Sequence, residues 1–202
     1  MKKNFLDNSI TRIKKKYPKY SEEKIEIIYY GLEALYVLIS KSFVIFLLAF
    51  LLGIFYDVLL IFIFYGIIRT TAFGMHAEKS SHCYFVSITL FIGGALFWKY
   101  IDINYYIKLL LVVISLLVLI RYAPADTSKR PLINKKKRNL YKLITIINSC
   151  IYILLLIVLK NNIISNYIVV GLLEASLMIH PFTYRMFQLP YNNYKNYQND
   201  CI

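Results

Sequence analysis

The sequence predicts an all-α fold, a polytopic transmembrane helical bundle of about six spans preceded by an N-terminal amphipathic interfacial helix. Of the 202 residues, 58% are hydrophobic and 17% are charged, whereas a soluble domain is closer to about half apolar and a quarter charged. The apolar residues form long blocks instead of amphipathic stripes. Because backbone polar groups in a bilayer must be satisfied within the chain, we expect these blocks to be helices.

Residues 1–20 are expected to form an amphipathic helix on the cytoplasmic leaflet. On one face of such a helix lie the apolar side chains of Phe5, Leu6, Ile10 and Ile13. Three consecutive lysines crowd its end, and Tyr17-Pro18 stops it. An apolar face with a basic end is typical of interfacial helices; a frayed tail with a chance pattern is the alternative.

Six apolar blocks follow, each close to the ~20 residues that cross a bilayer as a helix. They cover residues 34–55, 57–74, 83–101, 103–121, 143–160 and 163–182. The second block has a polar end, so it could be broken or partly re-entrant. We treat residues 21–190 as one membrane-embedded domain and expect the Asn- and Tyr-rich residues 191–202 to be a disordered tail.

Basic residues indicate how these spans are oriented. The net charge is +13, with eight Lys and Arg in residues 1–33, two in 69–82, eight in 121–142 and two after 183. The opposite side would carry three, Lys99, Lys108 and Lys160. Cytoplasmic segments of membrane proteins are enriched in Lys and Arg. We therefore expect a multi-pass protein of the cell membrane with both termini in the cytoplasm.

The position of these basic residues also indicates which kinds of partner the chain would bind. Bases between apolar blocks favour the anionic leaflet and acidic polypeptides over nucleic acid. The sequence has no RNA-binding signature and no glycine-rich phosphate loop. Three cysteines, Cys83, Cys150 and Cys201, have no paired spacing, so a disulfide framework is not expected.

The first polar island, residues 69–83, gathers two histidines, a cysteine and charges of both signs. A thiolate is a nucleophile, and a nearby imidazole can take the thiol proton. His82 is adjacent to Cys83 and would point about 100° away on a helix. His76 would share its face but sit about 10 Å along the axis, so a His76–Cys83 pair requires a broken helix.

Two other interpretations of this island remain open. Cys83 at the head of a span could be a small apolar packing residue, with the histidines merely interfacial. A metal site of His76, His82 and Cys83 lacks a recognised ligand spacing, and we expect no metal or other cofactor.

A second polar island covers residues 121–138. Pro124 and Pro131 block helix continuation, which predicts a kinked loop. Its bases alone would suit a topology anchor, but a site that grips an acidic peptide or a carboxylate would also explain the framing prolines. In the last span, Glu174 has no evident local partner, and ionisable residues inside a membrane are functional candidates.

Several motifs together resemble one known family. Gly74-Met-His76-Ala is followed by Cys83-Tyr and a long apolar span, then by Tyr122-Ala-Pro-Ala-Asp-Thr-Ser-Lys-Arg-Pro131, and Glu174-Ala lies in the last span. This pattern resembles the accessory gene regulator protein B (AgrB) family over most of the chain. The resemblance implies a membrane cysteine endopeptidase of peptide quorum sensing, which cuts the C-terminal tail from a small amphipathic pro-peptide (AgrD-like) and promotes its cyclisation to a thiolactone or lactone.

By the same resemblance, His76 and Cys83 would be the catalytic pair, and an acyl-enzyme thioester on Cys83 would be the intermediate. The residues expected to bind substrate are Arg69, Gly74, Lys129, Arg130 and Glu174. The basic run after the proline loop reads Ser128-Lys129-Arg130, where some relatives have a third base. The family also suggests a homodimer. The rival hypotheses are a peptide exporter that does not cut its cargo and a catalytically inert membrane scaffold.

Overall fold

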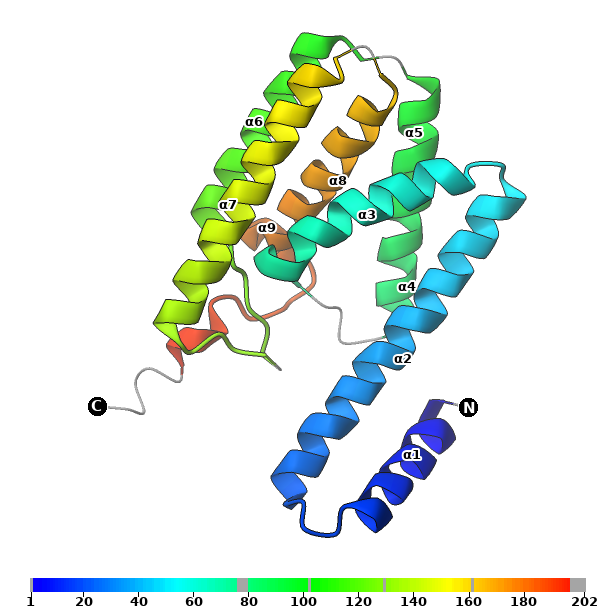
Figure 1. Ribbon diagram of the computed structural model, residues 1–202, viewed down its shortest axis with the longest axis vertical. Coiled ribbons are helices and arrows are strands. Elements are labelled where there is room, and N and C mark those ends of the chain that lie inside the picture. The colour runs from blue at the N-terminus through cyan, green and yellow to red at the C-terminus, as the bar shows by residue number, and fades with distance from the viewer. Residues whose placement is uncertain (1, 76–79, 102, 129, 161, 197–202) are drawn as a thin grey trace. The chain divides into compact units, whose positions relative to one another are not determined.

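The computed structural model describes residues 2–75, 80–101, 103–128, 130–160 and 162–196, with the backbone alone for residues 80–82. The regular elements in these ranges are helices (Figure 1). The chain divides into two compact units, Met1–Leu47 and Leu48–Ile202. The division falls inside the first long helix, so each unit is described by itself.

The first unit contains a helical hairpin. Helix α1 (Lys2–Lys16) confirms the helix expected over residues 1–20, and α2 (Glu22–Leu51) follows it. An ion pair of 2.7 Å joins Lys2 to Glu33, and the rings of Phe5 and Tyr36 lie 5.6 Å apart. These contacts turn the apolar face of α1 toward α2. The location of α1 on a lipid leaflet stays a prediction.

The second unit contains the remaining spans. They are α3 (Phe55–Ala72), a run made of α4 (Ser80–Ile88), the π-helical turn η1 (Thr89–Gly93) and α5 (Gly94–Tyr100), then α6 (Tyr105–Tyr122), α7 (Lys135–Val158) and α8 (Ile164–Ile179). Counting α2, the described residues contain five helices long and apolar enough to cross a membrane, and α8 is a shorter apolar helix. The all-α membrane bundle is thereby confirmed. Helix α3 is continuous, so the second span is not broken inside residues 55–72.

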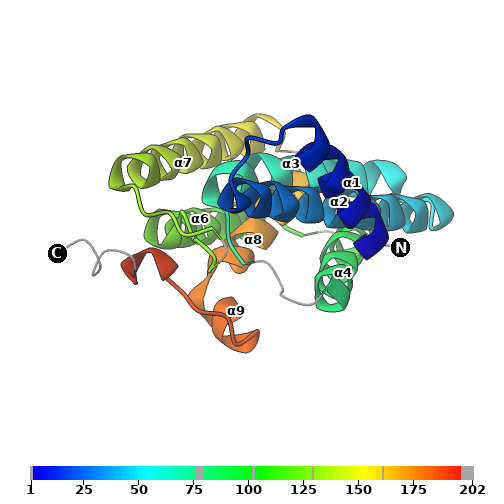
Figure 2. The same cartoon turned by 90° about the horizontal axis from the view of Figure 1, so that it is seen from below.

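Helix α8 is the core of this unit. Most of its residues are buried, and it packs against α3 on one side and α6 on another. Gly171 permits the contact with α3, because a Cβ there would lie 2.8 Å from the Cβ of Phe64. Helices α6 and α7 lie side by side in both views (Figures 1 and 2). Their outer faces expose large apolar side chains, which is the pattern expected where lipid replaces water.

Buried hydroxyl groups join the spans. The Thr145 hydroxyl donates to the Thr71 hydroxyl at 2.8 Å, and the Tyr152 hydroxyl donates to the Phe64 carbonyl at 2.9 Å. In lipid, such interhelical hydrogen bonds supplement van der Waals packing. They hold α7 against α3.

The two ends of the second unit differ in chemistry. The residues that follow α3 and α6 lie at one end, together with α9 (Pro181–Met186) and the 3₁₀ turn η2 (Asn193–Lys195) (Figure 1). The C-terminal ends of α5 and α7 and the N-terminal ends of α6 and α8 lie at the other (Figure 1). We call these the loop end and the lysine end, since Lys99, Lys108 and Lys160 lie toward the second one.

Candidate functional site

The chain changes direction sharply after α3. Phe73 and Gly74 have φ angles of 54° and 111°, which no helix can continue. The described residues thus confirm that the helix carrying Arg69 ends before position 76. His76 itself lies outside the described residues, so its predicted pairing with Cys83 stays a prediction.

Backbone hydrogen bonds fix this turn against two other segments. The Gly74 N–H donates to the Ala125 carbonyl at 2.8 Å, and the Ala125 N–H donates to the Ala72 carbonyl at 3.0 Å. The Met75 N–H donates to the Met178 carbonyl of α8 at 3.1 Å. The two polar islands of the sequence therefore meet at the C-terminal end of α8.

Arg69 is the organising side chain of this turn. Its Nη2 donates to the Met75 carbonyl at 2.6 Å, and its guanidinium carbon lies 5.9 Å from the centre of the Tyr65 ring, one helical turn earlier. Its Nη1 is buried and has no hydrogen-bond partner among the described residues. A Cβ on Gly74 would lie 1.9 Å from this Nη1. Only glycine thus leaves room for the guanidinium beside the turn.

Cys83 lies near the same group. It is half-buried at the start of the long helical run, and it lies within electrostatic range of Tyr65. Arg69 and Cys83, which are separated by the segment leading through His76, therefore converge on one tyrosine. Sequence reasoning missed Tyr65; its spacing of four residues before Arg69 on a helix is the signal that could have found it.

Glu174 lies on α8 close to these residues. Its side chain is buried, its Oε2 has no partner among the described residues, and a Cβ on Gly94 would lie 2.7 Å from its Oε1. It is within electrostatic range of Tyr65. The structure therefore brings Glu174 toward the cluster of Tyr65, Arg69 and Cys83.

Arg130 lies on the second polar island beside the turn. Its guanidinium is 4.6 Å from the centre of the Phe73 ring, and its N–H donates to the Thr127 carbonyl at 3.0 Å. The side chain is exposed, so its charge stays available. Lys129, the other predicted substrate contact, lies outside the described residues.

Asp126 fixes the proline loop to the C-terminal segment. Its carboxylate accepts from the backbone N–H groups of Leu132, Asn193 and Tyr194, at 3.3, 2.9 and 2.7 Å. Its carbonyl accepts from the Tyr184 hydroxyl at 2.9 Å. Backbone N–H groups of the described part of the tail, up to 196, thus bond to Asp126; residues 197–202 lie outside the described residues, so the disorder expected for them stays a prediction.

A cavity of about 320 Å³ opens between this loop and the C-terminal segment. Burial raises the pKa of Tyr191 to about 12, so its hydroxyl stays a neutral donor at physiological pH. Three bases and several hydroxyl and amide donors surround the space, a composition that suits a carboxylate. The lining residues that carry these groups are Arg121, Arg138, Lys142, Asn139, Asn192, Tyr122, Tyr191 and Tyr194.

The fold and site define a class: an all-helical, multi-pass membrane protein whose basic loops and one cysteine meet at one end of the bundle. Comparison with known proteins gives the family. The model of the family described as Accessory gene regulator B matches residues 7–180. The chain therefore belongs to the accessory gene regulator B family.

Individual relatives agree with this assignment. An AgrB-like protein of Clostridium acetobutylicum is 30% identical over 168 residues, covering 83% of this chain and 80% of the relative. The accessory gene regulator protein B of Staphylococcus epidermidis is 31% identical over 151 residues, covering 75% and 77% of the two chains. An AgrB-like protein of Listeria innocua is 28% identical over 180 residues, covering 89% and 88%. No solved structure matches the chain.

Proposed function

We propose that the chain is a membrane cysteine endopeptidase that cleaves the C-terminal tail from a small pro-peptide and promotes cyclisation of the remainder to a thiolactone or lactone. Family membership supports a role in accessory gene regulator quorum sensing. The observation that carries the finer proposal is the convergence at Tyr65. Arg69 lies beside the Tyr65 ring and donates to the Met75 carbonyl, and Cys83 lies within electrostatic range of that tyrosine.

The proposed reaction is acyl transfer in two steps. His76 takes the proton of the Cys83 thiol, and the thiolate attacks the scissile carbonyl. The C–N bond breaks, the leaving amine takes the proton from His76, and a thioester remains on Cys83. A thiol or hydroxyl of the bound peptide then attacks this thioester, its proton passes to the Cys83 thiolate through His76, and the macrocycle leaves. Water must be kept out, because hydrolysis would give a linear acid.

Arg69 and Glu174 have complementary roles in this proposal. The buried Nη1 of Arg69 lacks a partner among the described residues, which makes it a donor for the oxyanion that develops on the scissile carbonyl. The unpartnered Oε2 of Glu174 is an acceptor for a backbone N–H of the substrate. Gly74 allows Arg69 to lie beside the turn.

Co-expression with a short amphipathic pro-peptide that has an internal Cys or Ser and an acidic tail tests this function. The product mass is measured by mass spectrometry in cells and medium. A shortened peptide that has also lost one water from the new ring is the expected product, and it should depend on the chain. Full-length peptide in the medium would instead indicate an exporter, and unchanged peptide in the cells a scaffold.

We expect Lys129 and Arg130 to hold the acidic C-terminal part of the substrate. Replacing both with alanine should slow cleavage 10- to 100-fold without abolishing it, because two charge-assisted contacts with the substrate contribute about 1.5–3 kcal/mol together. High salt should reproduce the loss. The matched control replaces Lys135 and Lys136, two exposed bases at the start of α7. Equal rates for both double variants at all salt concentrations would contradict this role.

We propose that both termini and the loop end face the cytoplasm, since twenty of the bases lie there by sequence. In a background without native cysteines, a cysteine replacing exposed Ser128 should resist a membrane-impermeant maleimide in intact cells. A cysteine replacing exposed Asn162 should react. The reverse pattern would invert the topology.

A further inference from the structure

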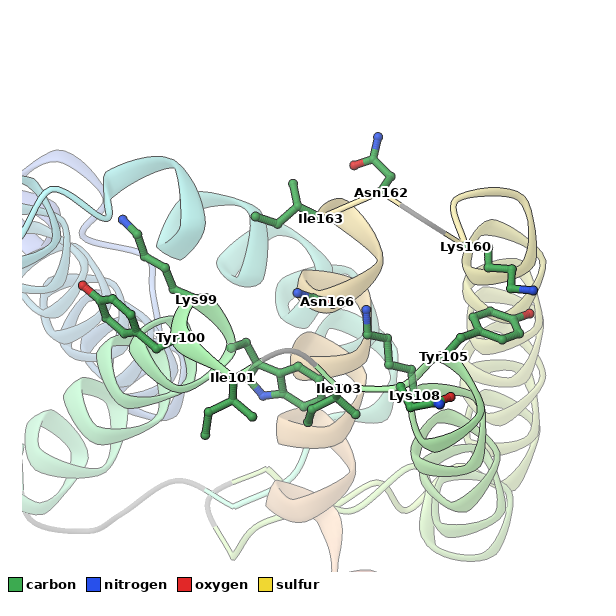
Figure 3. A pocket seen from close by; sticks show the side chains of 12 residues that line it. Lys99, Tyr100, Ile101, Ile103, Tyr105, Lys108, Lys160, Asn162, Ile163 and Asn166 are labelled. Atoms are coloured by element: carbon green, nitrogen blue, oxygen red, sulfur yellow. The ribbon is translucent and has the colours of Figure 1, made fainter.

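The lysine end contains a cavity of about 640 Å³ that the proposed reaction does not use (Figure 3). It lies between the C-terminal ends of α5 and α7 and the N-terminal ends of α6 and α8. Three lysines, three aromatic residues, three isoleucines and three asparagines line it. They are Lys99, Lys108, Lys160, Trp98, Tyr100, Tyr105, Ile101, Ile103, Ile163, Asn104, Asn162 and Asn166.

The three lysines are all the bases that the sequence assigns to this side of the bundle. Lys99 lies 3.7 Å from the Asp57 carboxylate. Lys108 is only 7% exposed, and its Nζ donates to the Ser165 hydroxyl at 3.5 Å. Lys160 lies over the Tyr105 ring at 4.8 Å. In the described part of the chain, no carboxylate lies within 4.0 Å of Lys108 or Lys160.

An ammonium group as buried as that of Lys108 needs compensation. Taking a charge out of water costs several kcal/mol unless an opposite charge or good hydrogen bonds replace the water. One hydroxyl at 3.5 Å is a weak replacement. The pocket is therefore built to receive an anion.

Asn166 adds a hydrogen-bond donor. Its side chain belongs to the lining and is 8% exposed; its Oδ1 is fully buried, and its amide nitrogen lies on the cavity side (Figure 3). An amide N–H donates, so this position also suits an anion.

The setting of the pocket identifies the source of such a ligand. Trp98, Tyr100 and Tyr105 gather where the helices end, as aromatic residues do at the headgroup level of a bilayer. Ile101 and Ile163 line the same pocket and remain exposed. A soluble anion would make no favourable contact with these apolar side chains, whereas the glycerol backbone and first methylene groups of a lipid would pack on them.

We propose that this pocket binds the headgroup of an anionic phospholipid. The phosphate lies against the ammonium groups of Lys108 and Lys160, and the Asn166 amide N–H donates to one of its oxygens. The site is separate from the reactive cysteine and does not depend on the proposed function. The attraction between ammonium groups and a phosphate at the headgroup level of the bilayer favours an anionic lipid over a neutral one.

Native mass spectrometry of the purified full-length protein tests the site. Phosphatidylglycerol, phosphatidic acid and phosphatidylcholine are offered at equal concentration in detergent micelles. The expected result is retention of phosphatidylglycerol and phosphatidic acid at least tenfold above phosphatidylcholine. Lys108→Met, which keeps an unbranched side chain but removes the charge, should lower that retention at least tenfold, and so should Asn166→Asp, which adds a negative charge.

The matched control is Lys136→Gln, which removes one charge at the loop end and should retain the lipid as the wild type does. The thermal midpoint of each variant in phosphatidylcholine micelles reports folding. A Lys108→Met protein with an unchanged midpoint but lost retention supports the site. Retention that is equal in wild type, Lys108→Met and Asn166→Asp, or lost equally in Lys136→Gln, would overturn it.

Two further measurements test whether the pocket takes a lipid headgroup, a free anion or neither. Inorganic phosphate at millimolar concentration should not displace the lipid; complete displacement would make this a free-anion site and overturn the lipid assignment.

Asp102 follows α5 in sequence and lies outside the described residues. If the wild type shows no lipid preference and Asp102→Asn acquires one, Asp102 already neutralises the pocket and the proposal is wrong.

Discussion

Replacement of Cys83 by alanine is expected to abolish cleavage of the pro-peptide, with a loss of roughly 1000-fold or more, because the nucleophile is removed. Cys83→Ser should be similarly inactive, since a serine hydroxyl is a far weaker acid than a thiol and one imidazole ionises it poorly. The residue is half-buried at the start of a helical run, so both small side chains should be accepted. The measurement is the rate of product formation at equal membrane abundance.

The two histidines provide the matched comparison for this result. His76→Ala should be nearly as damaging as Cys83→Ala, whereas His82→Ala should be mild, since adjacent side chains on a helix diverge. Alkylation of Cys83 at neutral pH should also slow in His76→Ala, because the base that takes the thiol proton is gone.

Each alternative outcome has a definite meaning. Cleavage retained in Cys83→Ala would remove the cysteine endopeptidase proposal and favour the exporter. An inactive His82→Ala beside an active His76→Ala would keep the enzyme class and move the base to His82. Cys150→Ala, on the exposed side of α7, should behave as the wild type in both assays.

Replacement of Gly74 by alanine is expected to lower cleavage about 100-fold, as misplacement of a reacting group by about 1 Å does. At a φ of 111° an L side chain is strained, and the new Cβ would lie 1.9 Å from Arg69 Nη1 and 2.8 Å from the Met178 carbonyl. The guanidinium would have to move away from the turn, and the Met75 carbonyl would lose its donor. The measurement is kcat of the variant with a synthetic pro-peptide.

Two other glycines serve as controls, because they separate the effect of backbone strain from the effect of displacing Arg69. Gly53→Ala has the same kind of strain, with a φ of 67°, but nothing lies within 4 Å of its new Cβ. Gly66→Ala, inside α3, has neither positive φ nor a close neighbour. Both should keep nearly full cleavage. If Gly74→Ala also kept it, the position of Arg69 would not matter for the reaction.

Composition and pattern were sufficient for the class of fold. Apolar blocks long enough to span lipid have one backbone solution, the helix, so the blocks at 57–74 and 103–121 became α3 and α6 within a few residues. The amphipathic helix at the N-terminus followed from side chains that share a face within one turn. Cys83, Arg69 and the proline loop could be singled out because polar chemistry is rare in such a chain.

Only the tertiary structure decided what those residues touch. Burial of Glu174, the contact of Tyr65 with Arg69, and the junction of the two polar islands at Gly74 and Ala125 depend on how α3, α6 and α8 pack. Helix packing in lipid is driven by close contacts at small residues such as Gly171, and the sequence does not say which other helix such a residue meets. The order of the segment around Asn193 likewise depends on one distant carboxylate, that of Asp126. The sequence by itself therefore determined the helices and the reactive residue types, while long-range packing determined the site and the lysine pocket.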